Sequence, residues 1–487
     1  MNMKTLPTTL AATLALLLGG CMVGPDYHRP QLPMPAQYKE LPGWTAASPG
    51  ADGAPKGDWW TAFNDPLLNE LEPMVSVSNQ TVQQAYANYQ QAQAEVQVAR
   101  ASLFPSLGIT GSATKQRSGS SSSTLSGGGL SRRAVGTSGS LEGSVSWAPD
   151  LWGKVRRWVE ENKANAQASQ AVLANATLSE QIALAEAVIE LRITDADIDV
   201  LQKTVDAYTE SLRVVENQGA AGTAAPSDVI TARTQLESAR SSLIALGVTR
   251  AQYAHAIAVL VGKNPEDLDI PHSTSLPALP TIPAGMPSTL LQRRPDIAVA
   301  ERDMAAQNAA IGVAVAAYYP NLTLSASDGF SQSPLAGLLH VANHVWSLGA
   351  NASETVFDFG ARHGQVAAAK AAYEAAVANY RGTVLTALRD VENDLSNLRI
   401  LAQQADVQDA VLRDATQGAQ IALNEYQAGT VDYTTAATAQ ATQLNAQQSA
   451  LSITQQRLLD TVSLIGDMGG GWSADQLNTA QPSTAER

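Results

Sequence analysis

Cysteine is almost absent from this chain: Cys21 is the only one among 487 residues. A single cysteine cannot form an internal disulfide, so stability must come from packing and assembly, even in a compartment that permits disulfides. Large aromatic side chains are also scarce, with 5 phenylalanines and an aromatic content of 5%. Alanine, glutamine, serine and threonine are abundant instead. This composition favours thin helical packing over a thick globular core.

Positive charge is in short supply as well. The chain carries 31 lysines and arginines against 45 acidic residues, which gives a net charge of -14 at pH 7. Nucleic-acid binding needs clustered basic residues that displace counterions from phosphates. The sequence therefore predicts no nucleic-acid partner.

Long hydrophobic runs are missing after Cys21. The longest candidate, Ala309 to Tyr319, is shorter than the eighteen or so apolar residues that a membrane-spanning helix needs. In lipid, only a helix or a closed barrel satisfies every backbone polar group. We therefore expect no transmembrane helix in the mature chain, and a closed β-barrel if the protein crosses a membrane.

What is present begins with the N-terminal leader. It has a charged start, an apolar core that ends at Leu18, and then Gly19 and Gly20 directly before Cys21. This pattern is typical of a lipoprotein signal peptide, in which small residues admit the peptidase. We expect residues 1–20 to be removed and a diacylglycerol to be attached to Cys21 by a thioether. The alternative is a buried free thiol in a cytosolic enzyme.

The chain also contains an internal duplication. Gly222-Thr223 recurs as Gly429-Thr430, an offset of about 207 residues, and residues 150–153 return as 358–360. Residues 104–107 return as 319–322, a few residues further displaced. Because the matches keep their order, we interpret the chain as two copies of one large unit.

Each copy predicts the same series of elements. A helix with a coiled-coil seam ends at Pro105 in the first copy, and its counterpart ends at Pro320 in the second. Alternating apolar and polar residues then predict strands, and each pair of strands forms a hairpin. Helices of roughly sixty residues follow, each spanning on the order of 90 to 100 Å. The expected strands are 107–114, 140–147, 322–326 and 345–356, with a serine- and glycine-rich outer loop at 119–139 and long helices to about Asn217 and Gln427.

Taken together, these features resemble the TolC-like outer-membrane efflux proteins, in particular the NodT-type lipoprotein branch of the RND-type efflux outer-membrane factors. The resemblance runs from Cys21 to about Met468 and depends on the order and spacing of several motifs. These motifs are Val23-Gly24-Pro25-Asp26-Tyr27, Trp59-Trp60 with Phe63 and Asp65-Pro66, Ser146-Trp147 with residues 149–154, Arg293-Arg294-Pro295-Asp296-Ile297, and Ile311-Gly312-Val313-Ala314.

The resemblance implies a mainly α fold with a membrane β-barrel. Each protomer of a homotrimer would give four strands to one twelve-stranded barrel, which continues into a periplasmic α-helical coiled-coil tunnel. It also implies sorting to the outer membrane, since Met22 and not Asp follows Cys21. The divisions are a signal peptide (1–20), an N-terminal anchor and equatorial segment (21–66), a first repeat (67–287, hairpin 106–147), a second repeat (288–472, hairpin 321–357) and a flexible tail (473–487).

Two groups of candidate functional residues follow. At the periplasmic tip, which in this family is the gate and the adaptor surface, the candidates are Asp228, Arg233, Tyr426, Asp432 and Tyr433. Local caps and solvated turns are the alternative there, and Thr438 stands where relatives commonly carry an acid. At the strand-to-helix boundaries, candidate membrane-interface aromatics are Trp147, Trp152, Trp346, Phe357 and Phe359, with packing of the junction as the alternative.

No residue pattern predicts catalysis or a metal site. His340 and His344 have a spacing that can bind zinc on a helix, but no third ligand is near them, so we interpret them as surface residues of the second outer loop. Arg293 and Arg294 are expected to brace the linker between repeats beside the helix start at Pro295. No cofactor is expected apart from the lipid on Cys21, and no enzymatic activity.

The predicted function is the outer-membrane duct of a tripartite efflux pump. It would conduct drugs and other small molecules passively from an inner-membrane pump and a periplasmic adaptor (membrane fusion) protein to the exterior. The alternatives are an exit duct for type I protein secretion and a non-conducting structural lipoprotein. The predicted hairpins disfavour the last of these.

Overall fold

The computed structural model describes residues 22–40, 58–117, 135–280 and 290–478. Cys21, the predicted signal peptide and most of the predicted loop 119–139 lie outside these residues. The first half of the chain contains η1 (Trp59–Phe63), α2 (Pro66–Ser78), α3 (Gln80–Ala101), β1 (Ser106–Arg117), β2 (Val135–Trp147), α4 (Lys154–Ala220), α5 (Pro226–Leu260) and η2 (Pro265–Asp267). The second half contains α6 (Leu290–Arg293), α7 (Pro295–Ala316), β3 (Asn321–Gln332), η4 (Val341–Asn343), β4 (His344–Ser353), α8 (Ala361–Gln427), α9 (Tyr433–Asp467) and η5 (Ala474–Asn478).

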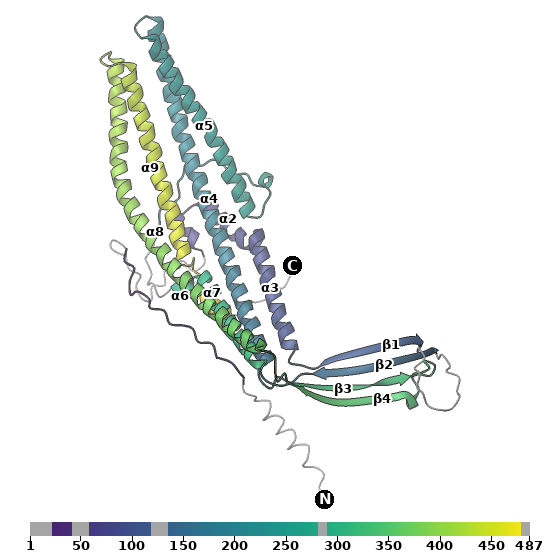
Figure 1. Cartoon of the computed structure of the whole chain (residues 1–487). Coiled ribbons are helices and arrows are strands. Elements are labelled where there is room, and N and C mark those ends of the chain that lie inside the picture. Colours follow the sequence, from purple (N-terminus) through teal and green to yellow (C-terminus); the bar gives the residue numbers. More distant parts are fainter. Residues whose placement is uncertain (1–21, 41–57, 118–134, 281–289, 479–487) are drawn as a thin grey trace, which may run out of the picture. The chain divides into compact units, whose positions relative to one another are not determined.

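The predicted duplication is confirmed by the lengths of the elements. Helices α3 and α7 have 22 residues each, α4 and α8 have 67 each, and α5 and α9 have 35 each. Each copy therefore consists of a helix, a β-hairpin, a very long helix and a returning helix (Figure 1). The finer domain boundaries stay a prediction; within the predicted tail, residues 474–478 form η5.

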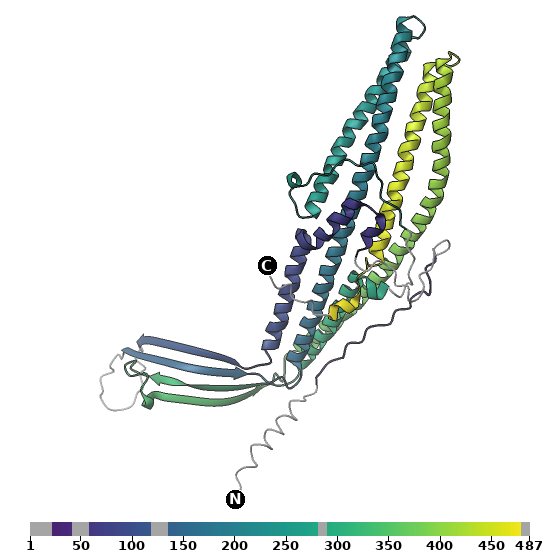
Figure 2. The same ribbon diagram turned by 180° about the vertical axis from the view of Figure 1, so that it is seen from behind.

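The four strands form one antiparallel sheet in the order β1-β2-β3-β4 (Figures 1 and 2). The predicted hairpins are confirmed, but their ends differ from the expectation. Strand β2 begins at Val135 instead of Ser140, and β4 ends at Ser353 instead of Val356. Ser353 lies opposite Asn321, the first residue of β3. The preceding residue, Pro320, has no N–H to continue the ladder, so pairing stops there.

The sheet has two chemically different faces. Leu107, Val145, Ala326 and Leu348 lie opposite one another across the four strands and form an apolar row. The adjacent row lies on the other face because side chains alternate along a strand, and it contains Ser144, Ser327 and Ser347. On this polar face the hydroxyls of Ser327 and Ser347 are 2.9 Å apart, and those of Ser112 and Ser140 are 2.8 Å apart. The sheet is thus amphipathic along these rows, whereas Lys115, Arg117 and Asp328 lie on the apolar side nearer the far ends of the strands.

Two helices are long and apolar enough to cross a membrane by length and composition. These are α4 and α5. The sequence expectation that no such segment exists was therefore wrong by this measure. Alanine, leucine and isoleucine interspersed with polar residues raise the mean hydropathy without forming a continuous apolar run. In α4 part of this apolar content has a packing role, because Leu184, Val188 and Ile189 are fully buried in the core.

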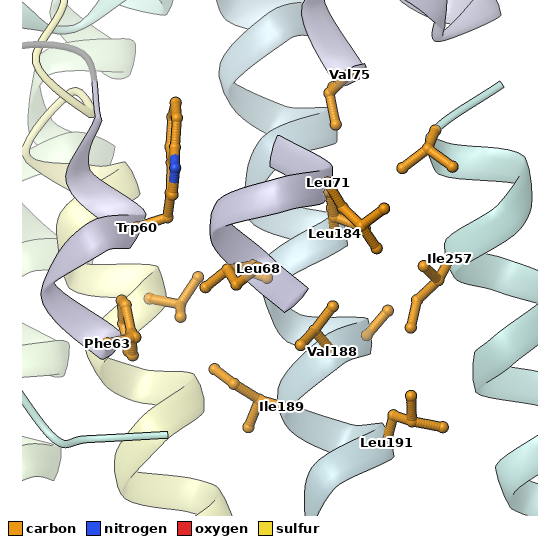
Figure 3. Close-up of a cluster of buried hydrophobic side chains, with 14 of the residues drawn as sticks. Trp60, Phe63, Leu68, Leu71, Val75, Leu184, Val188, Ile189, Leu191 and Ile257 are labelled. Carbon is orange, nitrogen blue, oxygen red and sulfur yellow. The ribbon is translucent and has the colours of Figure 1, made fainter. Parts of the chain in front are cut away.

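The chain divides into two compact units. The first draws on segments 1–30, 91–166 and 302–378 and contains the sheet, and the second draws on 31–90, 167–301 and 379–487. The second unit contains the main hydrophobic core, in which η1, α2, α4 and α5 meet (Figure 3). Trp59, Trp60 and Phe63 of η1 enter this core, and the indoles of Trp59 and Trp60 meet edge to face with centroids 5.9 Å apart. Further core residues are Leu68, Leu71, Val75, Leu191 and Ile257.

Asp65 and Pro66 explain the start of α2. The carboxylate of Asp65 accepts a hydrogen bond from the Leu68 amide at 3.0 Å, which caps the helix, and Pro66 occupies its first turn. The same carboxylate pairs with Arg192 of α4 at 2.9 Å, with both side chains buried. The motif around Trp59 therefore fixes the N-terminal segment onto α4.

Candidate functional site

The turns at the ends of the helical hairpins are built alike. Gly222 lies between α4 and α5 with φ +76°, and Gly429 lies between α8 and α9 with φ +75°. Left-handed backbone of this kind is accessible to glycine at little cost and closes the preceding helix. The Thr223 hydroxyl donates to the Gln218 carbonyl at 3.0 Å, and the Thr430 hydroxyl donates to the Glu425 carbonyl at 2.9 Å. The two tips are thus copies of one turn.

A tyrosine–glutamine cluster fastens the two hairpins together close to these turns. The rings of Tyr426 and Tyr433 meet edge to face with centroids 5.4 Å apart. The Tyr426 hydroxyl donates to the Gln218 side-chain oxygen on α4, and the Tyr433 hydroxyl donates to the Gln235 side-chain oxygen on α5 at 3.2 Å. Gln235 in turn donates to the Ala437 carbonyl of α9 at 3.1 Å. Two of the predicted tip residues therefore meet, each bonded to the opposite repeat.

The protonation of these tyrosines favours the cluster. Tyr433 is almost fully buried, and burial together with the neighbouring Tyr208 and Tyr426 raises its pKa to about 12. Burial and the charge of Asp228 also raise the pKa of Tyr426. Both hydroxyls therefore stay protonated at neutral pH and remain hydrogen-bond donors.

Asp228 and Asp432 act as local caps. The Asp432 carboxylate accepts hydrogen bonds from the Thr435 hydroxyl at 2.7 Å and the Thr435 amide at 2.9 Å, and these bonds lower the pKa of Asp432. The Asp228 carboxylate accepts from the Ala225 amide at 3.3 Å. The sequence analysis gave helix capping as the alternative to a gate role, and these contacts fit helix capping for both residues. Their part in a gate stays a prediction.

The remaining tip residues lie on exposed helix surface. Arg233 pairs with Glu216 at 2.9 Å, and both side chains are about half exposed, so the pair contributes little stability. The Thr438 hydroxyl donates to the Thr434 carbonyl of its own helix at 2.8 Å. Thr438 therefore satisfies its hydroxyl locally and adds no charge at the tip.

Two of the predicted aromatics pack at the strand-to-helix boundary of the first repeat. Trp147 ends β2, and its indole N–H donates to the Leu103 carbonyl at 3.0 Å. Trp152 stacks on Tyr319 with centroids 4.9 Å apart, and its indole N–H donates to the Pro320 carbonyl at 2.8 Å. These bonds satisfy the polar edge of each ring where the chain leaves the sheet.

The aromatics of the second repeat are exposed, and one of them lies elsewhere than expected. Phe357 and Phe359 follow β4, with 71% and 91% of their surface exposed and ring centroids 4.5 Å apart. Trp346 is the third residue of β4, opposite Asp328, whereas the helix end of that strand is Ser353. The expectation that all five aromatics lie at one height was therefore wrong for Trp346, which is about 24 Å along the strand towards the outer loop.

The two histidines of the second outer loop do not share a helix face. His340 precedes η4, whereas His344 begins β4 and bonds the Asp328 carboxylate at 3.0 Å. Among the residues that the structure describes, no group of three or more potential ligands is placed to hold a metal ion.

A binding site for the N-terminal segment was missed by the sequence analysis. Arg157 of α4 has only 1% of its side chain exposed and holds residues 23–26. Its guanidinium donates to the carbonyls of Val23 at 3.1 Å and Gly24 at 3.2 Å, and to the Asp26 carboxylate at 2.8 Å. Glu160 completes the charge balance at 2.7 Å. We call this arrangement the arginine clamp.

Glycines bring the backbone close to the arginine clamp. Gly24 has φ +92°, and a Cβ there would lie 2.4 Å from the Gly312 Cα. A Cβ on Gly312 would lie 2.7 Å from the Arg157 Cγ. The motifs around Gly24 and Gly312 were identified from sequence, but their mutual contact was not. Met22, which directly follows the predicted lipid site, packs against Gly153.

Arg294, directly before α7, has the bracing role that was predicted for it, whereas that role stays a prediction for Arg293. Arg294 donates to Asp296 at 2.7 Å and to Asp467, at the end of α9, at 2.9 Å. Burial and the carboxylate of Asp467 raise the pKa of the nearby Asp394 on α8 to about 8. The linker between the repeats is thus tied to the end of α9.

The comparisons with known proteins agree with this architecture. The chain matches the family described as outer membrane efflux protein over residues 73–263 and 286–470. It is 30% identical to the solvent efflux pump outer membrane protein SrpC of Pseudomonas putida, with 98% of this chain and 100% of that protein covered. It is 30% identical to the pyoverdine export outer membrane protein OpmQ of Pseudomonas aeruginosa, with 99% and 100% covered.

Solved structures show the same fold. The outer-membrane channel OprN superposes with a TM-score of 0.84 and 28% identity, covering 93% of this chain and 100% of that one. The Campylobacter jejuni CmeC outer membrane channel also gives a TM-score of 0.84, at 23% identity, covering 93% and 96%. Since the family match extends over most of the sequence and both repeats, the chain belongs to the outer membrane efflux protein family.

Proposed function

We propose that the protein is the outer-membrane channel of a tripartite efflux pump, through which small molecules pass passively to the exterior. The observation that carries the proposal is the amphipathic four-stranded sheet whose strands lead directly into helices of 67 residues. The relatives that it resembles are named for efflux of toluene and solvents and for export of pyoverdine. The proposal assigns no catalytic step to the chain.

The open edges of the sheet support a homotrimer. Strands β1 and β4 are the edges, and each carries backbone groups without a partner in this chain's sheet. In lipid such edges are too costly to remain open, so the sheet must close with further copies. Three copies give a barrel of twelve strands, an even number as in bacterial outer-membrane barrels. The apolar row through Leu107 would then face lipid, and the serine-rich face would line a wet bore.

The long helices supply the periplasmic part of the duct. A helix of 67 residues spans about 100 Å. That length suits contact with a periplasmic adaptor and, through it, an inner-membrane transporter that provides the energy. The duct itself needs only an opening at the tip.

The tyrosine–glutamine cluster at the tip is the proposed closure. Tyr426→Phe removes the hydroxyl that donates to Gln218 and leaves the ring packing on Tyr433. We expect cells that express this variant to become more sensitive to vancomycin, which is too large for a closed tip. The matched control is Tyr86→Phe, since the Tyr86 hydroxyl has no hydrogen-bond partner among the described residues. Equal vancomycin sensitivity of the two variants, at equal expression, would contradict this closure.

The lipid on Cys21 is the second element of the proposal. The arginine clamp supports it, because residues 23–26, which begin two positions after the acceptor, are held on the folded chain. Cys21→Ser should abolish incorporation of labelled palmitate into the mature protein. Unchanged labelling of the serine variant would refute the assignment of Cys21.

A further inference from the structure

The internal repeat places four aromatic residues in two equivalent pairs. Trp152 stacks on Tyr319 at the strand-to-helix boundary, with centroids 4.9 Å apart. Trp152 belongs to the first repeat and Tyr319 to the second, so this stack joins one repeat to the next. In the repeat, Trp152 corresponds to Phe359, because each directly precedes a glycine of positive φ. Tyr319 corresponds to Phe104, because each directly precedes a proline.

The second pair is not joined within one chain. Phe359 has 91% of its surface exposed and Phe104 has 69% exposed. Phe359 meets only the ring of Phe357, its own neighbour in sequence, among the aromatic contacts of the described residues. Two phenylalanines are thus left in solvent at the positions where the equivalent residues form a stack.

The register of the sheet confirms that the two repeats are equivalent residue by residue. Adding 215 to a residue number in β1 and 207 to one in β2 converts the pair Ser106 and Ser146 into Asn321 and Ser353, which is the observed pairing of β3 with β4. The same conversion reproduces all ten pairs recorded between β3 and β4. The pairing of β2 with β3 joins the first repeat to the second. It therefore serves as the template for the pairing of β4, in the second repeat, with β1 in the first repeat of another copy of the chain.

We propose that Phe359 packs on Phe104 of the partner subunit, and that β4 pairs antiparallel with β1 of the partner subunit with Ala350 opposite Ala113. The partner is a second copy of this chain. The register follows from the observed pair Gly143 and Asp328, which the repeat equivalence converts into Ala350 and Ala113. The inference rests on the trimer of the proposed function and specifies its contacts.

Three features are consistent with this register. Ala350 and Ala113 both lie on the apolar face of the sheet, so the face remains continuous across the junction. The same register places Arg117, the last described residue of β1, opposite the exposed indole of Trp346 on the partner subunit, a geometry suited to a cation–π contact. It also covers Phe359 and Phe104, which removes an exposed apolar patch at the junction.

Disulfide formation between neighbouring strands tests the register directly. We would introduce Ala350→Cys together with Ala113→Cys, because opposed residues in antiparallel strands bring their Cβ atoms within about 5.5 Å. The control pairs Ala350→Cys with Ser112→Cys, whose side chain lies on the other face. Lipidated Cys21 offers no free thiol. A second pair, Phe359→Cys with Phe104→Cys, is tested with a short bismaleimide, and Val341→Cys with Phe104→Cys is its control.

The expected result is a covalent trimer on a non-reducing denaturing gel for both test pairs, and single chains for both controls. Light scattering on the same samples establishes whether they are trimers. Trimers that remain uncross-linked, or that cross-link through Ser112 instead of Ala113, would overturn the inference while leaving the proposed function intact. If the trimers remain uncross-linked, Phe359 and Phe104 would face lipid instead. Preparations without trimers would overturn both proposals.

Discussion

Glu72 is expected to limit the stability of this protein at neutral pH. Its side chain is fully buried on α2, and neither carboxyl oxygen has a hydrogen-bond partner among the described residues. Burial raises the pKa of Glu72 from 4.5 to about 9. The folded protein therefore carries a neutral acid at pH 7, whereas the unfolded chain carries a carboxylate.

The size of the effect follows from the pKa values. Below pH 4.5, Glu72 is protonated in both states and has no influence on the pH dependence. As pH rises from 4.5 towards 9, only the unfolded state loses the proton, so the free energy of unfolding falls by about 1.4 kcal/mol per pH unit. At pH 7 the accumulated loss is about 3 kcal/mol. Above pH 9 both states are ionised and the loss no longer grows.

Two substitutions test this reasoning. Glu72→Met removes the ionisable group and the polar atoms, and it should raise the free energy of unfolding at pH 7 by about 3 kcal/mol. Glu72→Gln should gain less, because its buried amide also lacks a partner. The matched control is Glu70→Gln on the exposed face of the same helix, which should change little.

The assay is denaturant unfolding of the detergent-solubilised protein, followed by helical circular dichroism from pH 5 to pH 8. The stability of the natural protein should fall with pH more steeply than that of the Met and Gln variants, by about 1.4 kcal/mol per unit. Parallel pH profiles for the natural protein and Glu72→Gln would refute the assignment of a neutral Glu72.

Two further predictions concern packing. Gly312→Ala should weaken the arginine clamp and increase proteolysis of the N-terminal segment, because the new Cβ would lie 2.7 Å from the Arg157 Cγ. The control is Gly364→Ala, where a Cβ meets no atom within 4 Å. This control should stabilise α8 by about 0.5–1 kcal/mol. Equal protease sensitivity of the two variants would contradict the clamp. Asp65→Ala leaves Arg192 buried without its partner and should cost about 3–5 kcal/mol in the same unfolding assay. A loss below 1 kcal/mol would show that Arg192 finds another partner.

The repeat and its hairpins could be predicted from the sequence because they depend on local signals. Pro105 and Pro320 stop the helices, the period changes from helical to alternating, and Gly222 and Gly429 mark the turns. These signals act over a few residues. Strand ends were less well predicted, since β4 ends where its partner strand begins and not where its own pattern changes.

The contacts of the candidate sites could not be predicted because their partners are far apart in sequence. Tyr426 bonds to Gln218, 208 positions away, and Arg157 bonds to Asp26, 131 positions away. Their residue types gave partial signals: the tyrosines were candidates, whereas the arginine was not. The sequence signal for Glu72 is weaker: Leu68 and Val75 adjoin it on one side of the helix, but Asn69 and Ser76 adjoin it on the other.

The measurement that tests the central claim most directly is single-channel current through the purified, lipidated trimer in a planar bilayer. A gated duct predicts brief openings of small conductance for the natural protein and longer or larger openings for Tyr426→Phe, whose tip lacks the bond to Gln218. The Tyr86→Phe control should behave as the natural protein does. Trimers established by light scattering that pass no current, with or without the tip substitution, would contradict the account.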